Sequence, residues 1–232
     1  KTRPHVQSAA MLSVDWVSHA TAERAVMLWH YSRRMPVGKL VKVGAWEDGA
    51  FIGAVLFGRG ANNKMGAAFS LSQTECVELV RVALTKHVTP VSKIVAVALR
   101  FLAKRCPGLK AVISYADPKH GHVGGVYQAG GWIYTGKSST STEYFIDGRW
   151  MHGREATSGA FGKKTGSRIR PTTVKRTAEG KYRYIKALDR KTAERLSKFA
   201  KPYPKHARAV KDSAGVPLGE TFEPIHALQE AN

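Results

Sequence analysis

Three side chains that can exchange protons or bind metals lie close together near the middle of the chain. Asp117, His120 and His122 follow an apolar segment and precede a glycine-rich stretch that runs to Gly136. A carboxylate and two imidazoles can act as general acids or bases, or can bind a divalent cation. The alternative is structural: an aspartate that caps a helix and two solvated histidines. The segment alone leaves both interpretations open.

The elements around this loop explain why its side chains would meet a ligand. Residues 111–115 are short, apolar and rich in β-branched side chains, which predicts a buried strand. Residues 122–129 can carry the start of a helix. In open α/β sheets, ligands bind beyond the carboxyl ends of the strands. We therefore expect Asp117 and both histidines to face a substrate.

The rest of the chain alternates strands and helices. The fold class this predicts is α/β, with one mixed sheet and helices on both of its faces. An Asp-Gly turn at 48–49 predicts a hairpin, and Ser92 is the expected N-cap of a helix that ends at Pro107-Gly108. Apolar patterning predicts helices over 21–31 and 92–104, and further strands over 11–17, 39–46, 51–57, 78–84, 132–135 and 143–146.

The charge of the chain points to a polyanionic partner. Thirty-seven Lys and Arg against 17 Asp and Glu give a formal charge of +20, and residues 163–211 hold 17 basic and three acidic residues. Nucleic acid fits such a surface, because each neutralised phosphate releases condensed counterions. An anionic membrane is disfavoured, since the segment has no long apolar stretch. A solvated tail remains the alternative, but apolar side chains interleave the charges: Tyr182, Tyr184, Ile185, Leu188, Leu196 and Phe199.

The composition also suggests how the chain is divided. We expect one globular domain over residues 11–150, a flexible basic linker over 151–177 that is rich in Gly, Ser and Thr, and a basic extension over 178–232. Asp189 is expected to begin a short helix over 190–200 in that extension. The two cysteines lack the spacing of a zinc site or a disulfide framework, and no window is long and apolar enough for a membrane span. These features favour a reduced cytosol.

The predicted order of elements resembles the GCN5-related acetyltransferase fold. In that family a loop between a strand and a helix holds the diphosphate of coenzyme A, and residues 85–92, TKHVTPVS, occupy the corresponding place. Such a loop needs glycines so that its backbone N–H groups can approach the phosphates. Val88, Pro90 and Val91 stand there instead. Coenzyme A binding of the ordinary kind is therefore not expected.

A more specific resemblance spans roughly residues 26–145. In this order the chain carries WHYSRR (29–34), PVGK (36–39), FGRGAN (57–62), ELVRVAL (78–84), SYAD (114–117) and GHVGGVYQA (121–129). Together these segments resemble the bacteriophage Mom proteins, DNA-modifying relatives of the acetyltransferases. The resemblance implies conversion of adenine in DNA to N6-carbamoylmethyladenine, which protects phage DNA from restriction enzymes in the cytoplasm of the bacterial host.

The resemblance also implies site residues. His30, Tyr31, Asp117 and Tyr127 are the expected catalytic set, and Arg81, Ser32 and Lys39 are expected to bind substrate or an anion. Each has a structural alternative. Arg81, for example, lies in an apolar strand, so it either pairs with Asp117 or Glu78 or awaits an anionic ligand. The expected contacts to double-stranded DNA come from the basic segment: Lys163, Lys164, Arg168, Arg170, Lys175, Arg176, Lys181 and Arg183.

The chemistry of adenine suggests roles for the expected catalytic residues. The exocyclic amine of adenine is a poor nucleophile, so a base, either Asp117 or His30, is expected to take its proton, with Tyr31 or Tyr127 as acid or stacking partner. The base must leave the duplex to react, and Trp29 with the two tyrosines suits a flipped base. The product has an alkyl linkage, whereas acetyl transfer from acetyl-coenzyme A would give an amide, so the donor is not identified. The resemblance also allows iron or another divalent metal at His30, Asp117, His120 and His122, although the spacing of these residues is not a recognised ligand pattern.

Two other functional classes fit parts of the sequence. A coenzyme A-dependent N-acetyltransferase that acts on a protein or small amine would need the loop at 85–92 to bind its cofactor. A non-catalytic DNA-binding protein would use the basic segment but would leave Arg81, Asp117 and Tyr127 without a task. Thioester binding discriminates the first class, and nucleoside analysis discriminates the second.

Overall fold

The computed structural model describes residues 10–60, 64–158 and 167–205. Seven strands form the main sheet in the order β1-β2-β3-β4-β5-β10-β6, and three more form a small sheet in the order β8-β7-β9. The main sheet consists of β1 (Leu12–Trp16), β2 (Leu40–Glu47), β3 (Ala50–Gly58), β4 (Cys76–Leu84), β5 (Ala111–Ala116), β10 (Tyr182–Ala187) and β6 (Ile133–Lys137). The small sheet consists of β7 (Ser141–Ile146), β8 (Arg149–His152) and β9 (Lys175–Ala178).

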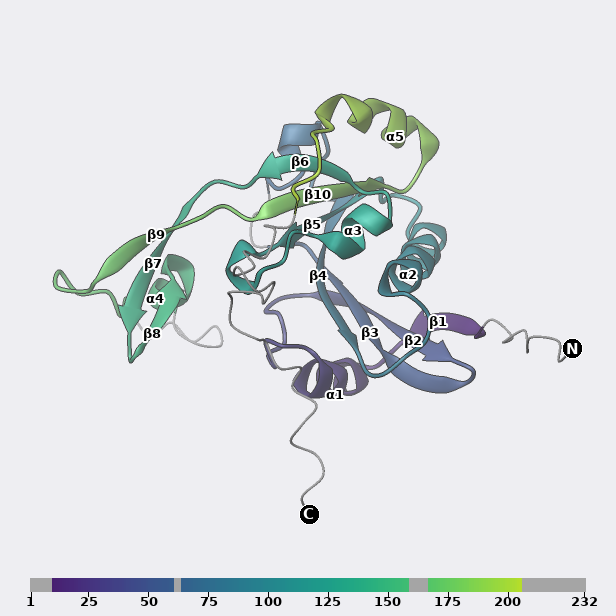
Figure 1. Ribbon diagram of the computed structural model, residues 1–232, viewed down its shortest axis with the longest axis horizontal. Helices are drawn as coiled ribbons and strands as arrows, with labels where there is room; N and C mark the ends of the chain where they lie inside the picture. The colour runs from purple at the N-terminus through teal and green to yellow at the C-terminus, as the bar shows by residue number, and fades with distance from the viewer. Residues whose placement is uncertain (1–9, 61–63, 159–166, 206–232) are drawn as a thin grey trace, which may run out of the picture.

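Helices cover both faces of the main sheet, as the sequence predicts (Figure 1). Neighbouring residues of β3 point to opposite faces, so its side chains identify the two layers. Ala54 and Leu56 pack with the buried side of α1, whereas Val55 and Phe57 pack with α2. The helices are α1 (His19–Trp29), α2 (Val91–Arg105), α3 (Gly125–Ala129), α4 (Gly153–Ser158) and α5 (Arg190–Leu196), with short 3-10 turns η1 (Ala67–Phe69), η2 (Pro118–His120) and η4 (Ser197–Phe199). The predicted fold class, a mixed α/β sheet, is confirmed.

The sheet opens between β4 and β5. Within the described residues these are the one parallel pair, and their pairing ends at Glu78 and Ile113. A β-bulge in β4 lies just beyond, because Leu56 of β3 pairs with Arg81 while Phe57 pairs with Leu79. A bulge bends its strand and redirects the side chains next to it. The two strands therefore diverge from Leu79 onward and leave a gap that side chains can line.

The small sheet is an arm that grows out of the main sheet. β6 runs into β7 and β9 runs into β10, so a two-stranded ribbon leaves the body and ends in the three-stranded sheet (Figure 1). The ribbon stays paired where it leaves, since the backbone N–H of Ser138 donates to the carbonyl of Lys181 at 2.8 Å. The N–H of Lys181 in turn donates to the Ser138 hydroxyl at 2.9 Å. The arm and the body are thus continuous.

This connection corrects the predicted division of the chain. Residues 182–187 were expected in an extension outside the domain, but β10 lies between β5 and β6 in the main sheet. The predicted linker over 151–177 likewise contains the end of β8, α4 and the start of β9. Tyr184 and Ile185 are fully buried, so apolar packing, and not charge, decides where this basic segment lies.

Two smaller details of the helices complete the comparison. α2 begins after Pro90, and no side chain caps it, so Ser92 is not the N-cap that the sequence suggests. Asp189 does begin α5, since its carboxylate accepts from the N–H of Thr192, and η4 continues the helix to Phe199. Among the helices of the described ranges, none combines the length and apolarity that crossing a bilayer requires.

Candidate active site

A cavity of about 1140 Å³ fills the gap between the diverging ends of β4 and β5. Its walls come from the end of α1, from β4, from the loop after β5 and from the root of the arm. Of the predicted catalytic and substrate-binding residues, five line it: His30, Tyr31, Arg81, Asp117 and Tyr127. Segments up to almost 100 positions apart in the sequence therefore meet in one hollow. Ser32 and Lys39 do not line it.

His30 caps the end of α1 and is buried. Its Nδ1 accepts a hydrogen bond from the backbone N–H of Ser32 at 3.1 Å and lies 2.8 Å from the Ser32 hydroxyl. Because Nδ1 is an acceptor, the neutral ring carries its proton on Nε2. Burial, the charge of Arg81 and then that of His122 lower the pKa of His30 to about 4. Ser32 thus holds the His30 ring in the tautomer with its proton on Nε2. His30 is therefore a neutral N–H donor at neutral pH.

Tyr31 lies at the mouth of the cavity with 60% of its surface exposed. Three imidazoles surround it: its ring centroid is 4.3 Å from that of His30, 5.0 Å from that of His120 and 5.9 Å from that of His122. Flat rings around an exposed phenol offer a stacking surface. His122 also lines the cavity, and burial, followed by the charge of His120, lowers its pKa.

Arg81 presents donors that the described protein atoms leave unused. Its Nη1 donates to the Val80 carbonyl at 2.7 Å, whereas its Nε is buried and has no hydrogen-bond partner. Of the three predicted arrangements for Arg81, the pair with Asp117 is not formed, because that carboxylate pairs with Lys181, whereas the charge of Glu78 does act on the guanidinium. A buried guanidinium with an unused N–H costs free energy until an acceptor arrives. The geometry therefore suits a ligand oxygen or an anion at Arg81.

Asp117 follows β5 and combines two tasks. One carboxylate oxygen accepts from the N–H of Lys119 at 3.1 Å and so caps η2, as the structural alternative expected. The other lies 2.7 Å from the ammonium of Lys181 at the root of the arm. Burial alone would raise the pKa of Asp117, but the hydrogen bond and charge of Lys181 outweigh it and lower the pKa. Asp117 is therefore a carboxylate at neutral pH, on the wall of the cavity.

Tyr127 reaches the cavity wall from α3, and Ser114 fixes its proton. The Ser114 hydroxyl is 2.9 Å from the Leu79 carbonyl and 2.8 Å from the Tyr127 hydroxyl. Ser114 has one proton, and a carbonyl can only accept, so all three groups are satisfied when Ser114 donates to Leu79 and Tyr127 donates to Ser114. Burial raises the pKa of Tyr127, which keeps it a phenol. Sequence analysis missed Ser114, because a serine inside a buried strand carries no signal of its own.

Tyr184 of β10 holds the glycine-rich loop before α3. Its ring is fully buried, and its hydroxyl donates to the Val123 carbonyl and accepts from Gln128. A Cβ on Gly124 would come within 2.4 Å of that ring, and Gly124 has a φ of +85°. Glycine therefore meets both a steric and a conformational demand here. The loop that carries Asp117 and the helix that carries Tyr127 are held in place by the segment predicted to be a tail.

The basic residues predicted to contact DNA fall into three groups. Lys181 and Arg183 line the cavity, where Arg183 also lies over the ring of Phe69 at 5.0 Å. On the arm, Arg168 pairs with Asp147, Arg176 pairs with Glu143, and Arg170 and Lys175 are exposed. Lys163 and Lys164 lie outside the described residues.

The residues expected to bind iron do not assemble a ligand set. Across residues 10–60, 64–158 and 167–205, no three His, Cys, Asp or Glu side chains stand close enough together to hold a metal ion. Nδ1 of His30 is engaged by Ser32, and both oxygens of Asp117 have partners. The ring centroids of His120 and His122 are 6.1 Å apart around Tyr31. We therefore derive no step through a metal.

The loop after β4 does not offer its amides to a diphosphate. The N–H groups of Val88 and Thr89 donate to the two carboxylate oxygens of Glu47, at 2.8 and 2.7 Å. Hydrogen bonds from Thr89 and Val88 lower the pKa of Glu47, so this buried side chain stays ionised. A carboxylate of the protein thus occupies the place where a phosphate would accept these bonds. Sequence analysis missed Glu47, since it lies more than forty positions from the loop.

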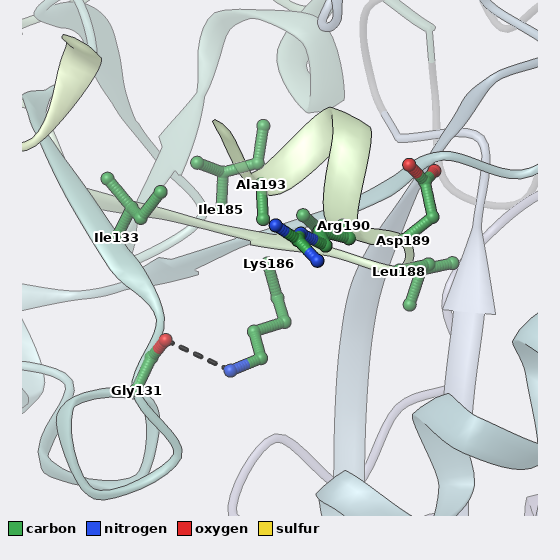
Figure 2. Close-up of a pocket in the computed structure, with 9 residues that line it drawn as sticks. Gly131, Ile133, Ile185, Lys186, Leu188, Asp189, Arg190 and Ala193 are labelled. Carbon is green, nitrogen blue, oxygen red and sulfur yellow. Dashed lines mark hydrogen bonds between the residues drawn. The ribbon is translucent and has the colours of Figure 1, made fainter. Parts of the chain in front are cut away.

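A second hollow, of about 310 Å³, lies beside α5 and has a structural explanation. Its walls are largely apolar, and Lys186 extends from β10 past it (Figure 2). The Lys186 ammonium donates to the carbonyls of Gly130 and Gly131 at 2.9 and 3.0 Å, where α3 ends. A cation at the carbonyl end of a helix stabilises it. Lys186 therefore anchors the helix that carries Tyr127.

Comparisons with known proteins identify the family of the chain. The model of the Mom protein family matches residues 11–205, and the chain belongs to this family. A relative in Escherichia phage Mu, methylcarbamoylase mom, is 30% identical over 205 residues that make up 84% of each chain.

The similarity to solved structures is more distant. An N-acyl amino acid synthase from uncultured soil microbes, FeeM, has a TM-score of 0.42 and 10% identity and covers 78% of this chain and 92% of its own. A putative acetyltransferase from Salmonella typhimurium, yncA, solved with acetyl-CoA, has a TM-score of 0.40 and 12% identity, with 77% and 94% covered.

Proposed function

We propose that this chain is a phage DNA-modifying transferase that converts adenine to N6-carbamoylmethyladenine and so protects phage DNA from restriction in the cytoplasm of the bacterial host. The observation that carries the proposal is the cavity between β4 and β5, which brings Asp117, Tyr127, Arg81 and His30 together. Membership of the Mom family, and the name of the phage Mu relative, support this chemistry. The volume of about 1140 Å³ has room for a purine base and a small donor.

Asp117 is the proposed base. As the N6–CH2 bond forms, the bond between that carbon and the donor's leaving group breaks, and the leaving group keeps the electron pair. N6 becomes positively charged, so its proton turns acidic enough for an ordinary carboxylate to accept it. The lowered pKa of Asp117 keeps it ready in the ionised form. His30 is unsuited to this role, because its Nδ1 lone pair accepts from the N–H of Ser32 and its Nε2 already carries the proton.

The other side chains position the reactants. Tyr127 donates its hydroxyl hydrogen bond to Ser114. Its oxygen therefore keeps lone pairs on the cavity side and can accept a hydrogen bond from an N–H of the adenine. Neutral His30 and the unused Nε of Arg81 are donors that suit the carboxamide oxygen of the donor or an anionic leaving group. Tyr31, exposed at the mouth, suits stacking on a base that has left the duplex.

Basic side chains around the cavity are the proposed contacts to the phosphates of double-stranded DNA. Removal of the whole segment after residue 163 is no test, because β10 is part of the main sheet. Replacement of Lys175, Arg176, Lys181 and Arg183 by Ala should weaken binding evenly across sequences and flatten its salt dependence. An unchanged salt slope in this variant would contradict the role.

Mass analysis of nucleosides tests the proposed reaction. DNA from bacteria that express the chain is digested, and the deoxyadenosine fraction should contain a species with one added carbamoylmethyl group. The same DNA should resist restriction enzymes. Unmodified adenine in cells that make abundant soluble protein would overturn the proposal. Binding of a coenzyme A thioester by the purified protein would favour an acetyltransferase instead.

A further inference from the structure

One face of the small sheet continues the wall of the cavity. Residues directly opposite each other on paired strands share a face. Glu143 pairs with His152 on one side and with Arg176 on the other, and Phe145 pairs with Trp150. Ser141 and His152, at the near end of this face, line the cavity. We call this surface the arm face, and it consists of Ser141, Glu143, Phe145, Trp150, His152, Val174, Arg176 and Ala178.

The opposite face of the small sheet is covered. Met151, which pairs with Tyr144 on that side, is buried, and so is Ala156 of α4. The arm face, in contrast, exposes apolar side chains near its outer end. Phe145 is 44% exposed and Val174 is 61% exposed. A small sheet has no need to leave an aromatic ring in water when its other face already supplies a core, so this exposure requires a different explanation.

Aromatic rings and cations gather on the arm face. The rings of Phe145 and Trp150 lie 5.4 Å apart, and the guanidinium of Arg176 lies over the Trp150 ring at 4.1 Å. The one carboxylate of this face, Glu143, forms ion pairs with two cations, Arg176 and Lys119 from η2. The face is therefore apolar at its outer end, positive beside it, and without an unpaired negative charge.

We propose that the arm face binds unpaired nucleotides of DNA next to the target adenine, with a base stacked on Phe145. The proposal rests on the proposed function, because the cavity supplies the reason for DNA to lie here. Aromatic rings beside a guanidinium suit single-stranded nucleic acid, since every base offers a flat face and every nucleotide a phosphate. A base that leaves the duplex also leaves its neighbours without a stacking partner, and an adjoining ring can replace it.

A second protein copy is the competing occupant, and two observations favour DNA. The arm face joins the cavity directly through Ser141 and His152, so a strand whose base enters the cavity can continue over this surface. Its charges also match phosphate, since Glu143 is already paired. A protein partner would explain the exposed ring of Phe145 but not why the face that carries it continues into the wall of the cavity.

The test compares wild type with Phe145→Ala by fluorescence anisotropy. The probes are a labelled single-stranded oligonucleotide that contains adenine and the duplex of the same sequence, each at several salt concentrations. Loss of one stacked base should weaken single-strand binding about ten-fold, weaken duplex binding less, and leave the salt slope unchanged. Phe145→Leu, which keeps most of the apolar packing, should show a loss in the same direction and guards against local unfolding.

Trp16→Ala is the matched control. Trp16 is 43% exposed, contacts Phe101 at 4.6 Å between ring centroids, and belongs to a cluster in which Arg105 lies over Phe101 at 5.4 Å. Its substitution should leave both affinities unchanged. Equal losses in Trp16→Ala and Phe145→Ala would overturn the proposal, because any exposed aromatic ring would then serve.

The remaining outcomes are equally decisive. Unchanged single-strand affinity in both Phe145 variants, or equal losses for single strand and duplex, would overturn the proposal. A dimeric wild type that becomes monomeric in Phe145→Ala, with unchanged DNA affinity, would assign the surface to a second copy instead. Nucleoside analysis reports separately on the proposed reaction: stacking on Phe145 without modified adenine would contradict the proposed function and leave the DNA-binding surface standing.

Discussion

The loops that follow the parallel strands β4 and β5 differ in whether their polar groups are already bound by the protein, so we call the first the closed loop and the second the open loop. After β4, the amides of Val88 and Thr89 are bound by the carboxylate of Glu47. After β5, Asp117 faces a cavity of about 1140 Å³ and pairs with an exposed lysine. Two amides of the closed loop are thus bound by a carboxylate of the protein, whereas the carboxylate of the open loop lies on the wall of the cavity. The carboxylate of Asp117, and not the amides of Val88 and Thr89, therefore borders the cavity.

The largest effect should come from the open loop. Asp117→Asn keeps the shape of the side chain but removes its ability to accept a proton, so the rate of adenine modification should fall about a hundred-fold or more. DNA binding should persist, because the basic side chains remain. Modified nucleoside is measured in cells that express equal amounts of both proteins. Normal modification by the variant would remove Asp117 from the mechanism.

Arg81→Lys should have the next largest effect. A lysine keeps the charge but cannot present the forked donors of a guanidinium, so we expect a loss of modification of about ten- to a hundred-fold. The fold should be retained, since the cost of burying the unused Nε disappears with it. Modification rate and thermal unfolding are measured together. Full activity, or a gross loss of folded protein, would each contradict a role in ligand binding.

The positions of Asp117 and His30 could be predicted from the sequence, because local patterns mark the ends of the elements that carry them. The apolar run that ends at Ala116 and the polar residues after it place Asp117 at the end of a strand. Helical spacing places His30 at the end of α1. Both features depend on neighbouring residues. The full set of His30, Tyr31, Arg81, Asp117 and Tyr127, in contrast, is implied by the resemblance to the Mom proteins, and all five line the cavity.

The parts that were missed depend on distant contacts. Glu47 ends β2, and nothing in its neighbourhood indicates that it binds amides at Val88 and Thr89. The charges of β10 are typical of an exposed segment, because Arg183 and Lys186 flank Tyr184 and Ile185. The sequence therefore predicts an extension outside the sheet. Only burial in the completed sheet shows that the apolar residues decide its place. Non-local pairing of this kind has no short-range signal.

Acid should lower the stability of the folded protein through His30, over a pH range that its pKa sets. The pKa of His30 is about 4 in the folded protein and near 6.5 when unfolded, so only the unfolded state binds the proton between these values. The stability of the folded protein is unaffected by His30 above pH 6.5 and declines as the pH falls toward 4. Chemical denaturation across this range, on wild type and His30→Gln, measures the effect. An equal acid loss in both proteins would show that other groups are responsible.

The smallest effect on activity should come from the closed loop, and it tests the comparison most directly. Glu47→Gln keeps an acceptor for one amide but loses the charge, so the β4 loop should become less stable and the midpoint of thermal unfolding should fall. Modification per folded molecule should stay close to that of wild type, because Glu47 does not line the cavity. A matched control is Glu75→Gln, whose carboxylate accepts from the N–H of Ser72 in another loop. If the variant at Glu47 lost modification while the control kept it, the β4 loop would take part in the reaction, and the two loops would no longer differ in the way proposed.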